Sequence, residues 1–280
     1  MVNIAVIGIC GNSHFMRVNH FHEKGETLKA TAYEQEVGGK GINQAIAAAR
    51  MGANVSYLGA IGNDADGVLC KNVARENDIN AVLAVKKEHT ALAYILTNET
   101  GENQVTEFLG AELSKEDVLA FEEEIAKCDI LLMQQEVPSE VNSEAVRIAK
   151  KYGIRVILNP APAREIMQDL IENVFLITPN EQESQKIDLS KFEHYIITKG
   201  DKGCVIDGKI NVPSLKVKAI DTTGAGDTFN GVLAVCIAEG MTLKEACKYA
   251  VTASGLSVTK KMVLNSIPYR EEIERRLKNE

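Results

Sequence analysis

The stretch best suited to chemistry lies near the C-terminal end, where Asp221-Thr222-Thr223-Gly224-Ala225-Gly226-Asp227 leads into the apolar run 229–238. The apolar positions predict a buried helix, with Thr222 or Thr223 as its N-cap and glycines that permit a tight turn. A helix N-terminus offers free N–H groups to an anion, and Asp227 offers a base at the same point. This combination favours phosphoryl transfer, in which the N–H groups stabilise the moving group and the acid accepts a hydroxyl proton. On this motif alone, a glycine-rich turn with Asp227 as an ordinary helix-start residue is the alternative.

The composition and net charge of the chain limit the classes of partner that it can bind. The chain has 280 residues, 45% of them apolar and 25% charged, which is ordinary for one large globular domain or two smaller ones. The formal net charge of −8 argues against a general nucleic-acid binder, because phosphate contacts need a basic surface. A small phosphorylated ligand needs only local donors and stays possible.

Cysteines, histidines and hydropathy indicate the compartment. The five histidines have no metal-ligand spacing, no apolar stretch reaches membrane-spanning length, and the N-terminus lacks a basic segment typical of a signal peptide. We therefore expect a cytoplasmic protein with no membrane partner. The six cysteines form no C-x-x-C pair, so we expect buried free thiols in a reducing compartment: Cys10, Cys70, Cys128, Cys204, Cys236 and Cys247.

Alternating strand and helix patterns predict a mostly parallel sheet covered on both faces. The expected strands are 2–9, 55–61, 129–134, 154–158 and 174–178, and the expected helices are 42–51, 64–77, 114–127, 139–152, 163–171, 242–259 and 270–278. Short strands are expected at 203–206 and 209–213. Short antiparallel strands within 10–37 and a hairpin of 90–97 with 104–109 should pair with each other, away from the main sheet. Ligands of such sheets bind at the C-terminal strand ends, where the polar clusters 8–13, 134–136, Asn159, Asn180 and 198–203 fall.

Five motifs in order carry a family resemblance. Gly38-Gly39-Lys40-Gly41-Ile42-Asn43-Gln44-Ala45 and the Asp221–Phe229 stretch resemble the two signature motifs of the ribokinase (PfkB) family of carbohydrate kinases. Between them lie 133–136, 158–163 and 178–183, all in family order. The resemblance covers essentially the whole chain and is nearest to the ribokinase branch. It implies a single ribokinase-like domain over 1–280, a three-layer α/β/α mostly parallel sheet with a small β-lid at about 10–37 and 88–110.

The resemblance assigns roles to the residues around the phosphoryl group and its acceptor. Asp227 resembles the catalytic base, and the N–H groups of Gly224, Ala225 and Gly226 resemble an anion hole for the γ-phosphoryl. Glu136 matches a carboxylate near the sugar, and its alternative is a solvated acid at a strand end. The residues that this resemblance implies for acceptor binding are Gly39, Lys40, Asn43, Glu136, Asn12, Ser13 and Asp227.

The resemblance also implies a nucleotide side and two kinds of cation. Asn180 and Glu183 match an element that organises Mg²⁺-bound water, which suits an ion that keeps its waters; for Glu183 the alternative is an ordinary acid in a helix's first turn. The matching nucleotide loop supplies Thr198, Lys199, Gly200 and Gly203. A monovalent-cation site, for an ion such as K⁺, is matched by Asp221, Thr223, Ser257, Lys260, Met262 and Ser266. The family segment usually has lysine or arginine and then glycine where this chain has Lys260-Lys261-Met262.

Two departures bear on specificity. The ribokinase branch has asparagine and aspartate where gapless alignment places Gly11 and Ser13, and a serine cannot accept from two neighbouring hydroxyls as a carboxylate does. Ribose is therefore doubtful, and we expect an acceptor that differs where that aspartate would sit, by a masked or missing hydroxyl or an acidic or bulky substituent. His14 and Arg17 add donors there, unless they lie on the lid surface. The stretch 180–195 is also short, which reduces cover on the nucleotide side.

The sequence therefore predicts an ATP-dependent kinase that phosphorylates a hydroxyl, primary by preference, on a sugar or sugar-like molecule. Mg²⁺ is required, K⁺ is a candidate activator, and the resemblance implies a homodimer through the β-lid. A nucleoside kinase of the same fold is one alternative. A catalytically silent sugar-binding regulatory protein is another, and sugar-stimulated ATP hydrolysis separates it from a kinase.

Overall fold

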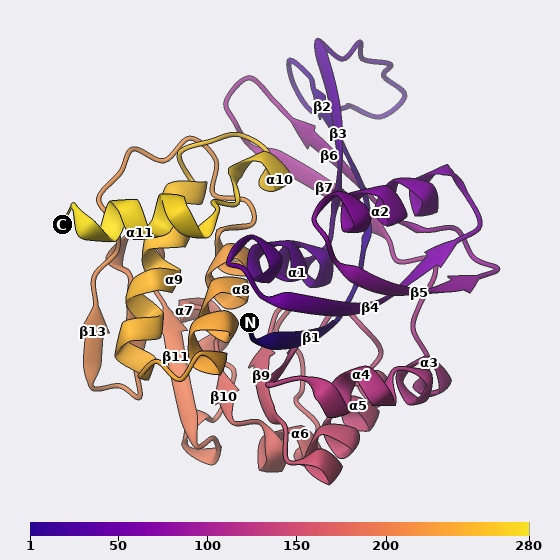
Figure 1. The fold of residues 1–280 in the computed structure, drawn as a ribbon. Helices are drawn as coiled ribbons and strands as arrows, with labels where there is room; N and C mark the ends of the chain where they lie inside the picture. Colours follow the sequence, from indigo (N-terminus) through magenta and orange to yellow (C-terminus); the bar gives the residue numbers. More distant parts are fainter. Residues whose placement is uncertain (280) are drawn as a thin grey trace.

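The computed structural model describes residues 1–279 and contains a large sheet and a small one (Figure 1). The large sheet has nine strands in the order β13-β12-β11-β10-β9-β8-β1-β4-β5. Neighbouring strands from β11 to β5 are parallel, and β12 and β13 form an antiparallel edge. The strand bounds are β1 (Asn3–Ile7), β4 (Asn54–Gly62), β5 (Asn80–Lys86), β8 (Ile130–Gln134), β9 (Arg155–Asn159), β10 (Leu176–Ile177), β11 (His194–Thr198), β12 (Cys204–Ile206) and β13 (Ile210–Val212).

Helices cover both faces of this sheet and make two cores. Alternate residues of β1 point into each, with Ile4 and Val6 in one core and Ala5 and Ile7 in the other. The first core lies under α1 (Lys40–Arg50), α2 (Ala65–Glu76), α8 (Ala225–Ala238), α9 (Leu243–Ser257) and α11 (Arg270–Lys278). The second lies under α3 (Lys115–Ala120), α4 (Glu122–Lys127), α5 (Ser139–Tyr152) and α6 (Gln168–Asn173). The expected three-layer α/β/α architecture is thus confirmed.

The small sheet stands at one end of the large one (Figure 1). Its order is β3-β2-β6-β7, with β2 (Gly11–Arg17), β3 (Ala32–Gly38), β6 (Ala91–Thr97) and β7 (Asn103–Phe108). The β2–β3 and β6–β7 pairs are antiparallel, and β2 pairs with β6 in parallel. The predicted pairing of the two early strands with the later hairpin is confirmed, and we call this sheet the β-lid.

Several predicted elements differ from the structure. The helix expected at 114–127 is two helices that meet at Phe121. The helix expected at 163–171 begins only at Gln168, because residues before it are tied to the end of β8, with Arg164 donating to the Val137 carbonyl and Gln135 to that of Glu165. The strand β5, the strand β11 and the short helix α10 (Val263–Ser266) were not predicted. Between Asn180 and the start of β11 at His194, the chain forms α7 (Glu181–Ser184) and a 3₁₀ turn at Leu189–Lys191, as the shortness of this stretch implied.

All six cysteines are free and buried, as expected. No helix within residues 1–279 is long and apolar enough to cross a membrane.

Candidate active site

Asp227 lies in the first turn of α8, which begins differently from the expectation. Gly224, not a threonine, is the N-cap, and no side chain among residues 1–279 caps this helix. Gly224 adopts a left-handed conformation (φ 72°), and a Cβ there would approach Val263 Cγ1 to 2.4 Å, so the position requires glycine. The turn aims the N-terminus of α8 at the C-terminal edge of the sheet.

Gly226 differs from the expectation of a special backbone conformation, because it lies within α8 and has no positive φ. A Cβ at Gly226 would meet no atom within 4 Å among the described residues. The space in front of this residue is open. Glycine at this position therefore leaves room for another group, whereas glycine at Gly224 permits the turn.

Two amides orient the carboxylate of Asp227. Asn43 Nδ2 donates to one carboxylate oxygen at 3.0 Å, and Gln44 Nε2 donates to the other at 3.0 Å. Burial raises the pKa of Asp227, while the positive charge of Lys40 and the two amide donors work in the opposite direction. The result is a buried carboxylate with a strengthened affinity for a proton, as general-base chemistry needs.

A chain of buried polar groups ties Asp227 to the strand ends. Gln44 accepts from Gln134 at 2.7 Å and also donates to Asn159 at 3.2 Å. Thr178 donates to Asn230 at 2.6 Å, and Asn230 donates to the Gly226 carbonyl. Sequence reasoning assigned no role to Gln44 or Asn230, although each is a polar residue inside an apolar helical run, which is the signal for a buried network.

Lys40 and Glu136 form a pair at the N-terminus of α1. Gly39 caps this helix with φ 110°, and a Cβ there would come within 2.7 Å of the Ile9 carbonyl. Glu136 accepts from the Lys40 backbone N–H at 2.9 Å, and its other oxygen lies 3.3 Å from Lys40 Nζ. Glu136 is therefore a paired and largely buried acid, and its alternative as a solvated strand-end residue is wrong.

The charges of this pair are linked to Asp227. Burial raises the pKa of Glu136, and Lys40 opposes the rise. For Lys40, burial acts to lower the pKa, but the negative charges of Glu136 and Asp227 outweigh it and the pKa is raised. Lys40 thus stays protonated between two carboxylates, beside the open space at the N-terminus of α8.

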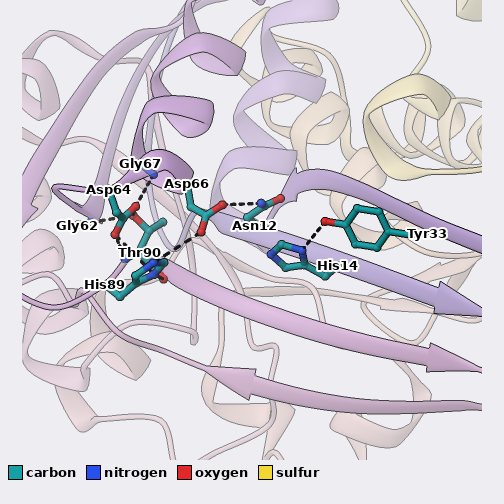
Figure 2. A network of polar contacts seen from close by, with 9 residues as sticks. All are labelled: Asn12, His14, Tyr33, Gly62, Asp64, Asp66, Gly67, His89 and Thr90. Atoms are coloured by element: carbon teal, nitrogen blue, oxygen red, sulfur yellow. Dashed lines mark hydrogen bonds and ion pairs between the residues drawn. The ribbon is translucent and has the colours of Figure 1, made fainter. Parts of the chain in front are cut away.

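Ser13 and Asn12 lie on opposite faces of β2. The Ser13 hydroxyl lies on the face of Gly38, whose Cβ would stand 3.1 Å from it. The Asn12 side chain instead points to α2, where Nδ2 donates to Asp66 at 2.6 Å, and His14 on the same face bonds Tyr33 at 2.9 Å (Figure 2). The structure therefore does not bring the Asn12 and His14 side chains to the side expected for the acceptor. Arg17 ends β2 and is exposed.

A polar network at the start of α2 fixes the β-lid to the body of the protein (Figure 2). Asp64 caps α2 by accepting from Gly67 N at 2.8 Å, and it also accepts from Thr90 N and Thr90 Oγ1, each at 2.8 Å. His89 lies between Asp64 and Asp66, with nitrogen–oxygen distances of 3.5 and 3.8 Å. The number and spacing of the histidines in the sequence did not predict this cluster, because Asp64 and His89 come together only in the fold.

The residues expected on the nucleotide side lie together at the ends of β10 and β11. Asn180 bridges Thr198, and the Lys199 N–H donates to the Gly203 carbonyl at 2.8 Å around the turn Gly200–Lys202. Asn180 and Glu183 form a reciprocal cap of α7, with Oδ1 accepting from Glu183 N and Oε2 accepting from Asn180 N, both at 2.8 Å. Burial raises the pKa of Glu183, and Lys40 is among the charges that oppose it.

Three of the six residues expected around a monovalent cation are joined where the loop before α8 approaches α10: Asp221, Thr223 and Met262. Asp221 accepts from Thr223 N at 3.0 Å and from Met262 N at 3.3 Å, so one carboxylate joins the two loops. The Ser257 carbonyl accepts from Lys260 N, and the Ser266 hydroxyl is buried against the Val263 carbonyl. Met262 has φ 65° and ψ 149°, a conformation that favours glycine, in the segment where the family usually has one.

Comparison with known proteins agrees with this geometry. The model of the pfkB family of carbohydrate kinases matches residues 1–270. The chain is 37% identical to a ribokinase of Haemophilus influenzae over 96% of each chain. It superposes on a ribokinase structure from Thermotoga maritima with a TM-score of 0.90 at 33% identity, covering 100% of both chains. An Arabidopsis thaliana ribokinase solved with ribose and ATP gives a TM-score of 0.89 at 26% identity over 99% of each chain. The chain therefore belongs to the pfkB family of carbohydrate kinases.

Proposed function

We propose that this protein transfers the γ-phosphoryl group of ATP to a hydroxyl group of a sugar or sugar-like molecule, preferably a primary hydroxyl. One observation carries the proposal: a buried carboxylate, Asp227, is oriented by two amides at the N-terminus of α8, directly after a glycine turn. Base and anion-binding groups thus occupy one helix turn. The Arabidopsis relative solved with ribose and ATP supports the two substrate classes.

In this proposal Asp227 accepts the proton of the attacking hydroxyl. A raised pKa suits that role, because the carboxylate binds the proton more strongly as the oxygen–phosphorus bond forms. The N–H groups of Gly224 and Gly226, which donate to no acceptor within residues 1–279, stabilise the developing charge together with the dipole of α8. The Ala225 N–H contributes less, because it donates to the Thr222 carbonyl at 3.3 Å.

Glu183 and Asn180 fit the role of orienting water bound to Mg²⁺. One oxygen of Glu183 bonds Asn180 N, while the other accepts no hydrogen bond within residues 1–279. A single open carboxylate oxygen suits contact through water, since Mg²⁺ keeps several of its waters. When bound, Mg²⁺ would neutralise charge on the phosphates. The loop of Thr198, Lys199, Gly200 and Gly203 would line the nucleotide beside it.

The loops around Asp221 fit a monovalent cation such as K⁺, because main-chain carbonyls, hydroxyls and one carboxylate are hard oxygen donors. Asp221 already joins the loop before α8 to Met262. A cation there would stiffen the turn at Gly224 and keep the anion-binding N–H groups in place. The contributing residues would be Asp221, Thr223, Ser257, Lys260, Met262 and Ser266.

Acceptor binding would use the N-terminus of α1, with Lys40, Glu136 and Asn43 around the hydroxyl and Gly39 allowing close approach. The β-lid carries exposed apolar side chains, with Tyr33 at 56%, Val105 at 55% and Phe108 at 53% exposure, which supports pairing with the lid of a second copy. We propose a cytoplasmic homodimer formed through this sheet.

The test is an acceptor panel of pentoses, hexoses, amino sugars, sugar acids and nucleosides, assayed for ADP release with ATP and Mg²⁺. Mass spectrometry of the acceptor then shows whether a phosphoryl group was added. The proposal expects a phosphorylated sugar as product. ADP release without a phosphorylated product, or phosphorylation of nucleosides only, would contradict it.

A further inference from the structure

One row of side chains crosses the β-lid on a single face. Ser13 on β2 pairs with Glu36 on β3 and with Ala93 on β6, and Ala93 pairs with Glu107 on β7. Directly paired residues of a sheet point to the same face. Glu36, Ser13, Ala93 and Glu107 therefore line up from one edge of the lid to the other.

This face is turned toward the catalytic residues. Glu36 accepts from the backbone N–H groups of Val263 at 2.8 Å and Leu264 at 3.1 Å, and Val263 packs on Gly224 at the start of α8. The neighbouring residue Asn12 points the other way, to Asp66 of α2 (Figure 2). This row of side chains therefore faces the space beside Lys40 and Asp227.

Of the two acids in the row, Glu36 already has partners and Glu107 has none. Within residues 1–279 the Glu107 carboxylate makes no hydrogen bond or ion pair, and it is exposed. Glu107 is also one of the negative charges that raise the pKa of Lys40, after Glu136 and Asp227 and against the effect of burial. The carboxylate of Glu107 therefore lies within electrostatic range of the acceptor-side lysine.

The residues between Glu107 and Ser13 leave a path for the carboxylate. Adjacent strands lie about 4.8 Å apart, so Ser13 and Glu107 are separated by two strand spacings. Ala93 between them has only a methyl group, and Ser13 itself is short. A glutamate side chain can extend over the alanine toward the space in front of Ser13.

We propose that Glu107 determines acceptor specificity: its carboxylate accepts hydrogen bonds from hydroxyl groups of a neutral sugar, and so replaces the carboxylate that Ser13 lacks. The inference rests on the proposed kinase function and deepens it. Glu107, Glu136 and Asp227 together outnumber the positive charge of Lys40, so the acceptor is an uncharged polyhydroxy compound and not a sugar acid. This replaces the expectation of an acidic substituent.

The test compares Glu107→Gln and Glu107→Ala with a matched control, Glu34→Gln. Glu34 is an exposed acid on the same face of the lid, one row farther out, opposite Phe15. The measurement is kcat/KM for neutral pentoses and hexoses, including D-ribose, and for the corresponding sugar acids. We expect both Glu107 variants to lose about 10- to 100-fold in kcat/KM, mainly through acceptor KM, because a hydrogen bond to a charged group is lost. The KM for ATP and the activity of Glu34→Gln should stay within about twofold of wild type.

A second comparison tests the replacement itself. Adding Ser13→Asp to Glu107→Ala should recover at least about tenfold in kcat/KM, because a carboxylate returns to the same face of the lid from β2, two strands away from β7. If wild type phosphorylates a neutral sugar and Glu107→Gln is equally active, or if wild type prefers a sugar acid, the role of Glu107 is wrong while the kinase function stands. If wild type phosphorylates no sugar, the kinase proposal itself is wrong, and the role of Glu107 with it.

Discussion

At the scale of single residues, the proposed mechanism makes the charge of Lys40 one control on how readily Asp227 works as a base. Asp227 accepts a proton only when it is ionised, so activity should be present above its pKa and lost as pH falls through it. Burial raises this pKa and Lys40 opposes the rise. The two residues are therefore coupled even though Lys40 also pairs with Glu136.

Lys40→Met should move the acid limb of the kcat/KM profile to higher pH, because the buried carboxylate of Asp227 loses the positive charge that opposes the rise of its pKa. Lys40→Arg keeps the charge and should leave the limb close to its wild-type position. The measurement is kcat/KM of wild type and both variants across pH, from ADP release at saturating ATP. An unmoved acid limb in Lys40→Met would show that another group controls it.

Substitutions at the two glycines before Asp227 should have different effects, one on kcat and the other on stability. The Cβ of Gly226→Val would meet no described atom within 4 Å, so we expect a change in unfolding free energy of about 1 kcal/mol or less but a large loss of kcat with little loss of ATP affinity. Gly224→Ala forces a left-handed alanine against Val263 and should cost about 1–3 kcal/mol of stability. Urea denaturation, ATP titration and kcat separate the two. Full activity in Gly226→Val would show that the phosphoryl group does not pass this loop.

The positions of the motif residues could be predicted from sequence because the local pattern fixes them. Asp227 lies in the first turn of a helix after a glycine turn, and Lys40 lies at the start of another helix, while their roles stay predictions. The direction of a side chain on a short strand could not be predicted, which is why Asn12 was grouped with Ser13 although β2 points them to opposite faces. The partners Gln44 and Asn230 depend on contacts between distant segments.

At the scale of elements, the N-termini of α1 and α8 converge on one space. Asn43 and Gln44 of α1 orient Asp227 of α8, and Glu136 from the loop after β8 accepts from the first N–H of α1. The capping network of α2 performs a different task, since Asp64 joins the helix start to Thr90 at the root of β6.

Asp64→Ala should lower the free energy of unfolding by about 2–4 kcal/mol, because it removes a helix cap and two further hydrogen bonds to one carboxylate. Asp64→Asn keeps one acceptor oxygen and should cost less. Urea denaturation measures both, and hydrogen exchange should show faster exchange in β2 and β6. If Asp64→Ala is as stable as wild type, the network does not fix the β-lid.

Element prediction succeeded where the pattern was strong and local. The helix α5 and the hairpin β6–β7 follow from periodicity and a polar turn. The strand β5 is a run of apolar residues that do not alternate with polar ones, and α10 is only four residues long, so neither has a strong periodic signal. Side-chain bonds to the end of β8, invisible in the sequence, delay α6.

At the scale of the whole molecule, the large sheet and the β-lid both contribute residues to the proposed active site. The strand ends supply Glu136, Asn159 and Asn180 along a single edge, as parallel topology requires. The β-lid adds the row that ends at Glu107, on the side proposed for the acceptor. The three-layer fold could be predicted from strand–helix alternation. The contacts that join α10, the lid and the turn before α8 could not, because they link segments far apart in the sequence.

The most direct test of the account is Asp227→Asn, measured with the best acceptor from the panel. Asn43 has a buried Oδ1 without a hydrogen-bond partner in the described residues, so its amide can turn and accept from the new side chain, and the fold should persist. We predict normal ATP binding and a fall in kcat of at least ~10²-fold, the usual contribution of a general base. Near-normal turnover with intact binding would contradict the account, because the proton would then be accepted elsewhere.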